Sequence, residues 1–169
     1  MKETVQNNII ETFKKLNETV SSFSQEDLNT IPYKNSWTAG QVIQHIILGC
    51  SGYPELFAGN TKKKIRKYDE HVSELERIFL DFNTKMDSPD FLKPEAKEYS
   101  KNSLTIKILE IESDLLKASE TYDLTLTCQD FQVPGFETFT IFEWINSGLI
   151  HTQRHTNQLN NILKYLNKL

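Results

Sequence analysis

The sequence is poor in cysteine, and the two cysteines that it has are far apart. Cys50 and Cys128 are the only ones among 169 residues, and they form no CxxC spacing. Disulfide-stapled domains and cysteine-ligated zinc domains both need paired or clustered cysteines. We therefore expect no disulfide framework and a reducing, cytoplasmic location, with each cysteine serving as a small buried hydrophobe.

Long apolar runs and an excess of positive charge are also missing. No stretch of about 18 apolar residues occurs, so we expect no membrane partner, and the N-terminus carries no signal-peptide pattern. A net charge of −4 argues against nucleic acid as a partner. The basic run 62–67 is interpreted as a solvated connecting loop. The alternative, a positive rim that attracts anionic substrates, stays open.

What the sequence does contain is amphipathic helical periodicity. Apolar residues recur at helical spacing over 3–22, over a second segment that starts after Thr38, and over 102–121, with a further pattern from Thr140 almost to the C-terminus. Thr38 with Gln41, and Thr140 with Glu143, form capping-box patterns at two helix starts. Ser24 is expected to cap one further turn, and Pro54 to bend or end the second helix.

A weaker helical pattern follows Asp69, which we expect to cap it, and includes Val72, Leu75 and Phe82. Residues 88–94 and 123–138 are expected to be long loops, and the second of them to cover one end of the molecule. No strand pattern is convincing. The sequence therefore predicts an all-α protein, a four-helix bundle with an additional short helix and long connecting loops, in a single domain covering residues 1–169.

Two histidines interrupt the apolar face of the last helix. His151 and His155 lie one turn apart on the arc that also carries Ile141, Trp144, Leu159 and Ile162. Imidazoles at positions i and i+4 point toward a common spot, a recurrent metal-binding arrangement. The plainer interpretation is a pair of core histidines that are hydrogen-bonded to nearby groups, and a third ligand is needed to decide between the two.

His45 is the candidate third ligand. It lies at the margin of the apolar arc of the second helix, and in a bundle this face can meet that of the last helix. Three histidines with one open position are the arrangement of catalytic zinc sites. Gly49, Gly52 and Gly148 lie on the same faces, and we expect them to leave a cavity beside the histidines. His71, the remaining histidine, is expected to be a surface residue.

Two segments resemble a known family. The sequence Trp-Thr-Ala-Gly-Gln-Val-Ile-Gln-His at 37–45, together with His-Thr-Gln-Arg-His-Thr-Asn-Gln-Leu at 151–159, is similar to the DinB-like (DinB/YfiT) superfamily of damage-inducible proteins. The resemblance covers nearly the whole chain. It implies a four-helix bundle, a homodimer, and a divalent metal, zinc or nickel, held by His45, His151 and His155.

The resemblance also suggests a function. Some members are similar to transferases that activate a low-molecular-weight thiol such as bacillithiol, or to mycothiol-dependent isomerases. The transferase branch often has a further histidine where this chain has Gln158. We expect a metal-dependent transferase or hydrolase acting on a small-molecule substrate, and a non-catalytic metal-binding bundle is the alternative. Gln41, Gln158 and Arg154 are candidates to orient the imidazoles or the substrate. Arg154 lies nearer the outer face, and for it the alternative is a surface charge.

Overall fold

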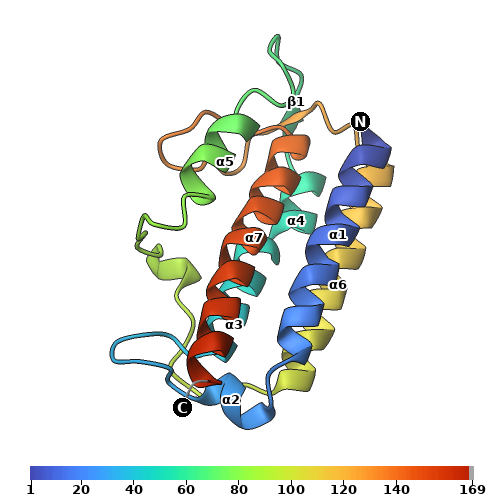
Figure 1. Cartoon of the computed structure of the whole chain (residues 1–169). Helices are drawn as coiled ribbons and strands as arrows, with labels where there is room; N and C mark the ends of the chain where they lie inside the picture. Colours follow the sequence, from blue (N-terminus) through green and yellow to red (C-terminus); the bar gives the residue numbers. More distant parts are fainter. Residues whose placement is uncertain (168–169) are drawn as a thin grey trace.

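Four long helices form the body of the protein in the computed structural model, which describes residues 1–167. They are α1 (Lys2–Ser21), α3 (Ala39–Cys50), α6 (Lys101–Thr121) and α7 (Ile141–Leu166). α1 packs against α6 and α7, and α3 packs against the same two helices, so the four helices surround a common core (Figure 1). The predicted all-α four-helix bundle is confirmed.

Shorter elements connect the long helices. The helical ones are α2 (Gln25–Asn29), α4 (Tyr53–Ala58), α5 (Val72–Phe79) and the 3-10 turn η1 (Asp90–Leu92). Two strands that the sequence did not predict, β1 (Thr61–Lys62) and β2 (Thr127–Cys128), pair antiparallel. They hold two loops together at the end of the bundle where α7 begins (Figure 1).

The helix starts follow the capping chemistry of the sequence. Thr38 and Gln41 make both hydrogen bonds of a capping box at α3, and Thr140 and Glu143 do the same at α7. Ser24 caps α2 in the same way, with Asp27 as its partner. After α3 the chain turns at Ser51 and Gly52, and Pro54 lies in the first turn of α4. Proline lacks the N–H that a helix interior requires, so it is tolerated at a start.

The periodic apolar residues form one continuous core. Val5, Ile9 and Phe13 of α1 are completely or almost completely buried, as are Ile43 and Ile46 of α3. The predicted inward residues of α6 and most of those of α7 are buried as well: Leu104, Ile108, Ile111, Leu115, Ala118, Ile141, Trp144, Ile145, Leu159 and Ile162. This aliphatic packing fixes α3 and α7 side by side. None of the helices within residues 1–167 has the length and apolar content to cross a membrane.

The weaker helical pattern predicted after Asp69 was only partly right. α5 begins after His71, which makes no side-chain cap, so the predicted cap by Asp69 is wrong. Phe82 lies beyond the helix and is 52% exposed. The expectation of a surface histidine at position 71 is also wrong, because its half-buried ring packs against Phe136 and Phe139. Aromatic residues from a distant loop decide this, and helical periodicity carries no information about them.

The basic run 62–67 is only partly a solvated loop. Its lysines are exposed, but the Arg66 guanidinium donates to both carboxylate oxygens of Glu143, at 2.9 and 2.6 Å. Glu143 is completely buried and also accepts from the backbone N–H groups of Thr140 and His71. A buried carboxylate needs such partners. Arg66 therefore ties this loop to the first turn of α7.

Candidate metal centre

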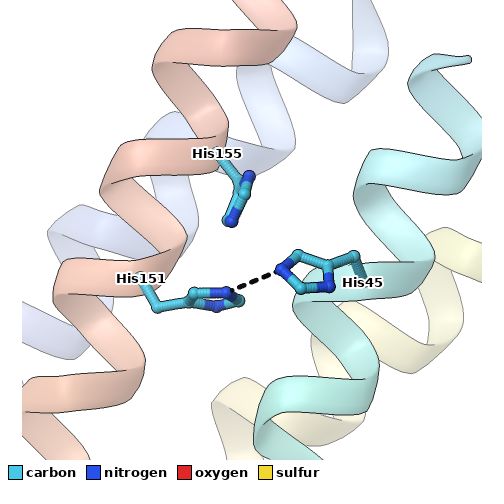
Figure 2. Close-up of side chains that lie close together, drawn as sticks. All are labelled: His45, His151 and His155. Atoms are coloured by element: carbon cyan, nitrogen blue, oxygen red, sulfur yellow. Dashed lines mark hydrogen bonds between the residues drawn. The ribbon is translucent and has the colours of Figure 1, made fainter. Parts of the chain in front are cut away.

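Three histidines from two helices meet where α3 faces α7. His45 of α3 is 4% exposed, and His151 and His155 of α7 are half-buried. One ring nitrogen from each lies within 4.8 Å of the corresponding nitrogens of the other two. Figure 2 shows the rings converging from the two helices, with the Nε2 atoms of His45 and His151 2.9 Å apart. The antiparallel packing of α3 and α7 brings together residues that are 106 positions apart in the sequence.

Two of the three imidazoles are oriented by carbonyl oxygens. Nδ1 of His45 lies 2.8 Å from the backbone oxygen of Leu92, and Nδ1 of His155 lies 2.8 Å from Oε1 of Gln158. A carbonyl oxygen only accepts, so each Nδ1 carries the proton. Nε2 of both rings is then left with a lone pair. This is the arrangement in which protein carbonyls orient metal-ligating histidines.

His151 completes the set through its contact with His45. Because Nε2 of His45 has a lone pair, Nε2 of His151 donates in the 2.9 Å contact between them. Moving that proton to Nδ1 of the same ring frees a third lone pair. Three nitrogens about 2.0–2.1 Å from a zinc ion lie about 3.3 Å apart in tetrahedral geometry. The rings therefore need only small movements to fit a divalent ion.

Within residues 1–167, the cluster consists of these three side chains, with no cysteine or carboxylate among them. Three neutral imidazoles suit zinc and nickel better than magnesium or calcium, which prefer oxygen ligands. The chemistry of the donors therefore fits the metal that the sequence suggested. It does not match a closed structural zinc site, which has four protein ligands.

Burial keeps all three imidazoles uncharged near neutral pH. Desolvation lowers the pKa of His45, partly offset by the Leu92 carbonyl. Desolvation also brings the pKa of His151 well below 6.5. Repulsion of a charged His151 ring by Arg154 and by the protonated forms of His155 and His45 lowers this pKa further. For His155, burial and the His45 charge lower the pKa to about 4 against the opposing effect of Gln158. Lone pairs are thus available to a metal without competition from protons.

The glycines near the histidines do not leave the expected cavity. A Cβ at Gly148 would lie 2.9 Å from the Tyr53 ring and 3.3 Å from Sγ of Cys50, so Tyr53 already fills that space. A Cβ at Gly49 would lie 3.1 Å from the His151 ring. Gly49 thus allows His151 to approach α3, while Gly52 is exposed and has no neighbour within 4 Å of such a Cβ. The prediction that Gly148 and Gly49 border an open cavity is wrong.

The three candidate supporting residues behave differently. Gln158 contacts His155, as expected. Gln41 does not reach a histidine, because its side-chain oxygen accepts from the Thr38 N–H in the capping box and its amide group donates to the Glu95 carbonyl. Arg154 points to the backbone of the segment after α5, donating to the carbonyls of Phe79 and Asp81 at 2.8 and 3.0 Å and to that of Thr84.

Two contacts of His45 could not be read from the sequence. The Leu92 carbonyl is a backbone group, which any residue type supplies, so no sequence signal marks it. Trp37 packs against the His45 ring with centroids 5.2 Å apart. Trp37 was visible only as part of the motif that carried the family resemblance.

Comparison with known proteins supports that resemblance. A family model described as DinB superfamily matches residues 9–159, which include all three histidines. Neither the curated proteins nor the solved structures contain a significant match to this chain.

Proposed function

This chain belongs to the DinB superfamily, and on that premise we propose that it is a metal-dependent enzyme. His45, His151 and His155 hold one divalent ion, zinc or nickel, which activates water or a low-molecular-weight thiol. The reaction is transfer of the thiol to a small substrate or hydrolysis of that substrate. The observation that carries the proposal is the pair of carbonyl contacts on His45 and His155, which leaves their Nε2 lone pairs facing His151.

The protein's own residues prepare the site. The Leu92 and Gln158 carbonyls hold two imidazoles in the tautomer that can ligate, and burial keeps all three neutral. A divalent ion bound to three imidazoles lowers the pKa of a coordinated water toward neutrality and deprotonates a coordinated thiol. His151 and His155 are half-buried, and we place the access of the substrate on their side, that of α7.

A non-catalytic metal-binding bundle is the second candidate. Tyr53 fills the space between α3 and α7 beside Gly148, so no substrate cavity opens on that side of the centre. This favours a metal that only joins the two helices. The small ligand set favours catalysis, since a fourth position stays open for water or substrate. We expect the first function to hold, with substrate entering from the half-buried side of the centre.

Metal content is the first test. Protein loaded with zinc or nickel and passed through a desalting column is expected to retain about one ion per chain, measured by elemental analysis. His151→Ala is expected to abolish retention. His71→Ala is the matched control and is expected to keep the metal, since His71 lies against Phe136 and Phe139. Wild-type protein that retains no metal would contradict the proposal.

A screen for thiol transfer and hydrolysis then separates the two candidates. Metal-loaded protein is incubated with a low-molecular-weight thiol and a generic electrophile, and separately with chromogenic esters. We expect turnover that disappears in His151→Ala and after chelation. Full metal retention without turnover on any substrate class would favour the non-catalytic bundle.

A further inference from the structure

The segment between α5 and the end of η1 contacts both helices that carry the three histidines, α7 and α3. At its start, Arg154 of α7 donates to the carbonyls of Phe79, Asp81 and Thr84. At its end, the Leu92 carbonyl contacts Nδ1 of His45 on α3. Arg154 precedes His155 directly and follows His151 by three residues. We call residues 80–92 the strap; in Figure 1 it descends beside α7 from α5.

Only the two ends of the strap are fixed. A turn closed by Asp81, which accepts from the Asn83 N–H and from the Thr84 hydroxyl, forms the first end. The 3-10 turn that packs against α3 forms the second. Between them residues 81–90 are exposed apart from half-buried Ser88. A segment with few buried contacts opens at low free-energy cost, so the strap depends on its two attachments.

The second attachment is also part of the metal centre. When Leu92 is in place, its carbonyl keeps the proton of His45 on Nδ1 and the lone pair on Nε2. When the strap detaches, His45 loses this preference and metal binding has to restore it. Attachment of the strap and binding of a metal are therefore thermodynamically linked. If the attached strap increases the affinity for a metal that needs the Nδ1–H tautomer by some factor, the bound metal increases the equilibrium constant for attachment by the same factor.

We propose that the attachment of the strap is coupled to metal binding, and that Arg154 is the positioning residue that fixes it. This inference rests on the proposed metal site and goes beyond it. Arg154 acts through the backbone, since its side chain donates to three carbonyl oxygens, that of Phe79 at the end of α5 and those of Asp81 and Thr84 in the strap. Its planar fork suits several acceptors at once, which a lysine ammonium cannot reproduce in the same geometry.

The direction in which a charge-removing substitution of Arg154 changes metal affinity distinguishes the positioning role from a purely electrostatic one. Arg154 is close enough to lower the pKa of His151 and His155. If its charge were all that mattered, Arg154→Met would remove repulsion and tighten the binding of a divalent cation. The positioning role requires the opposite, because Arg154→Met frees the strap and with it the Leu92 carbonyl. Arg154→Lys keeps the charge and loses the fork, so it should also weaken binding.

The experiment combines zinc titration with hydrogen exchange measured by mass spectrometry on the full chain. We expect Arg154→Met and Arg154→Lys to weaken zinc binding by about ten-fold or more, the typical effect of losing a group that orients a ligand. Amide exchange in residues 80–92 should become faster in both variants without zinc, and zinc should slow it in wild-type protein. Arg77→Met is the matched control, because Arg77 of α5 is exposed and pairs with exposed Glu74.

The outcomes distinguish the possibilities. Unchanged or tighter zinc binding by Arg154→Met, or strap exchange that zinc does not slow in wild type, would overturn the coupling. Faster exchange throughout the chain in Arg154→Met would show a general loss of stability and also count against it. If wild-type protein bound no zinc, the proposed function would fail. Faster strap exchange in the metal-free variants would then still establish the attachment by Arg154.

Discussion

At the scale of single residues, the position and tautomer of each clustered histidine depend on the group next to its ring. His45 and His155 each have a carbonyl oxygen on Nδ1, and His151 lies against a glycine. Carbonyl contacts choose the tautomer, and the missing side chain at Gly49 allows the ring to approach. The behaviour of the site should therefore respond to pH and to small changes in volume.

Metal retention should persist well below the ordinary pKa of histidine. Protons compete with a metal for the same lone pairs, and burial lowers the pKa of His155 from 6.5 to about 4, with those of His45 and His151 also lowered. We expect nickel or zinc to be released only as the pH falls toward about 4. Metal content after equilibration across the pH range measures this, and release centred near 6.5 would contradict it.

The same shifts affect the metal-free protein in a defined direction. Because the folded-state pKa values are lowered, the unfolded chain binds more protons between about 4 and 6.5. The free energy of unfolding of the metal-free form should therefore decrease as the pH falls through this window. Denaturant titrations at several pH values test the sign.

Gly49→Ala should damage the metal centre although it favours the helix. Alanine gains about 1 kcal/mol of helix propensity over glycine. Its Cβ, however, would lie 3.1 Å from Cε1 and 3.2 Å from Nδ1 of His151, so the ring must move. We expect zinc affinity to fall about ten-fold or more. Gly52→Ala is the control with nothing within 4 Å, and equal affinity of the two variants would show that His151 tolerates the added methyl group.

At the scale of elements, the start of α7 depends on a loop far away in the sequence. Glu143 is part of the Thr140 capping box, and its buried carboxylate also accepts hydrogen bonds from the Arg66 guanidinium. Desolvation raises the pKa of Glu143, but the hydrogen bonds from Arg66, Thr140 and His71 outweigh it and leave the pKa lowered. The first turn of α7 and the loop after β1 therefore form one unit.

Removing Arg66 should be strongly destabilising. Arg66→Met leaves the Glu143 carboxylate buried without its charged partner, since the side chain of Glu143 is 0% exposed. Breaking a buried pair in this way typically costs about 3–5 kcal/mol. Lys67→Met removes a neighbouring exposed charge and should change stability by no more than about 0.5 kcal/mol. Urea unfolding of both variants decides the matter, and equal midpoints would show that the pair contributes little.

At the scale of the whole molecule, aliphatic packing rather than the metal should hold the bundle together. The core runs through all four long helices, from Val5 in α1 to Ile162 in α7. A domain of this size buries enough apolar surface to fold without a metal or disulfide. A catalytic metal should consequently be removable without unfolding.

Chelation should lower the melting temperature only modestly. A bound ion stabilises the folded state by mass action, about 4 kcal/mol at a free concentration a thousand times its Kd. The cooperative transition should remain after chelation because the core persists. Thermal unfolding of metal-loaded and chelated protein, followed by circular dichroism, gives the answer. Loss of any cooperative transition in the chelated sample would mark a structural metal.

The helices, their capped starts and the inward placement of His151 and His155 were determined by the sequence itself. Periodicity and capping act within a few residues, so a linear pattern carries them. The family resemblance rested on residues 37–45 and 151–159, and the match over 9–159 confirmed it. His45 could be named because bundle geometry limits which helix faces can meet.

Only the tertiary structure decided what surrounds these residues. Tyr53 fills the space at Gly148, His71 packs against two aromatic rings, and the side chain of Gln41 takes part in a helix cap. The Leu92 carbonyl on His45 and the three carbonyls on Arg154 are backbone groups brought close by the strap. Backbone acceptors are the same for every residue type, and contacts across 47 to 75 positions depend on how helices pack. For that reason the three clustered histidines could be predicted from the sequence, whereas the groups that orient them could not.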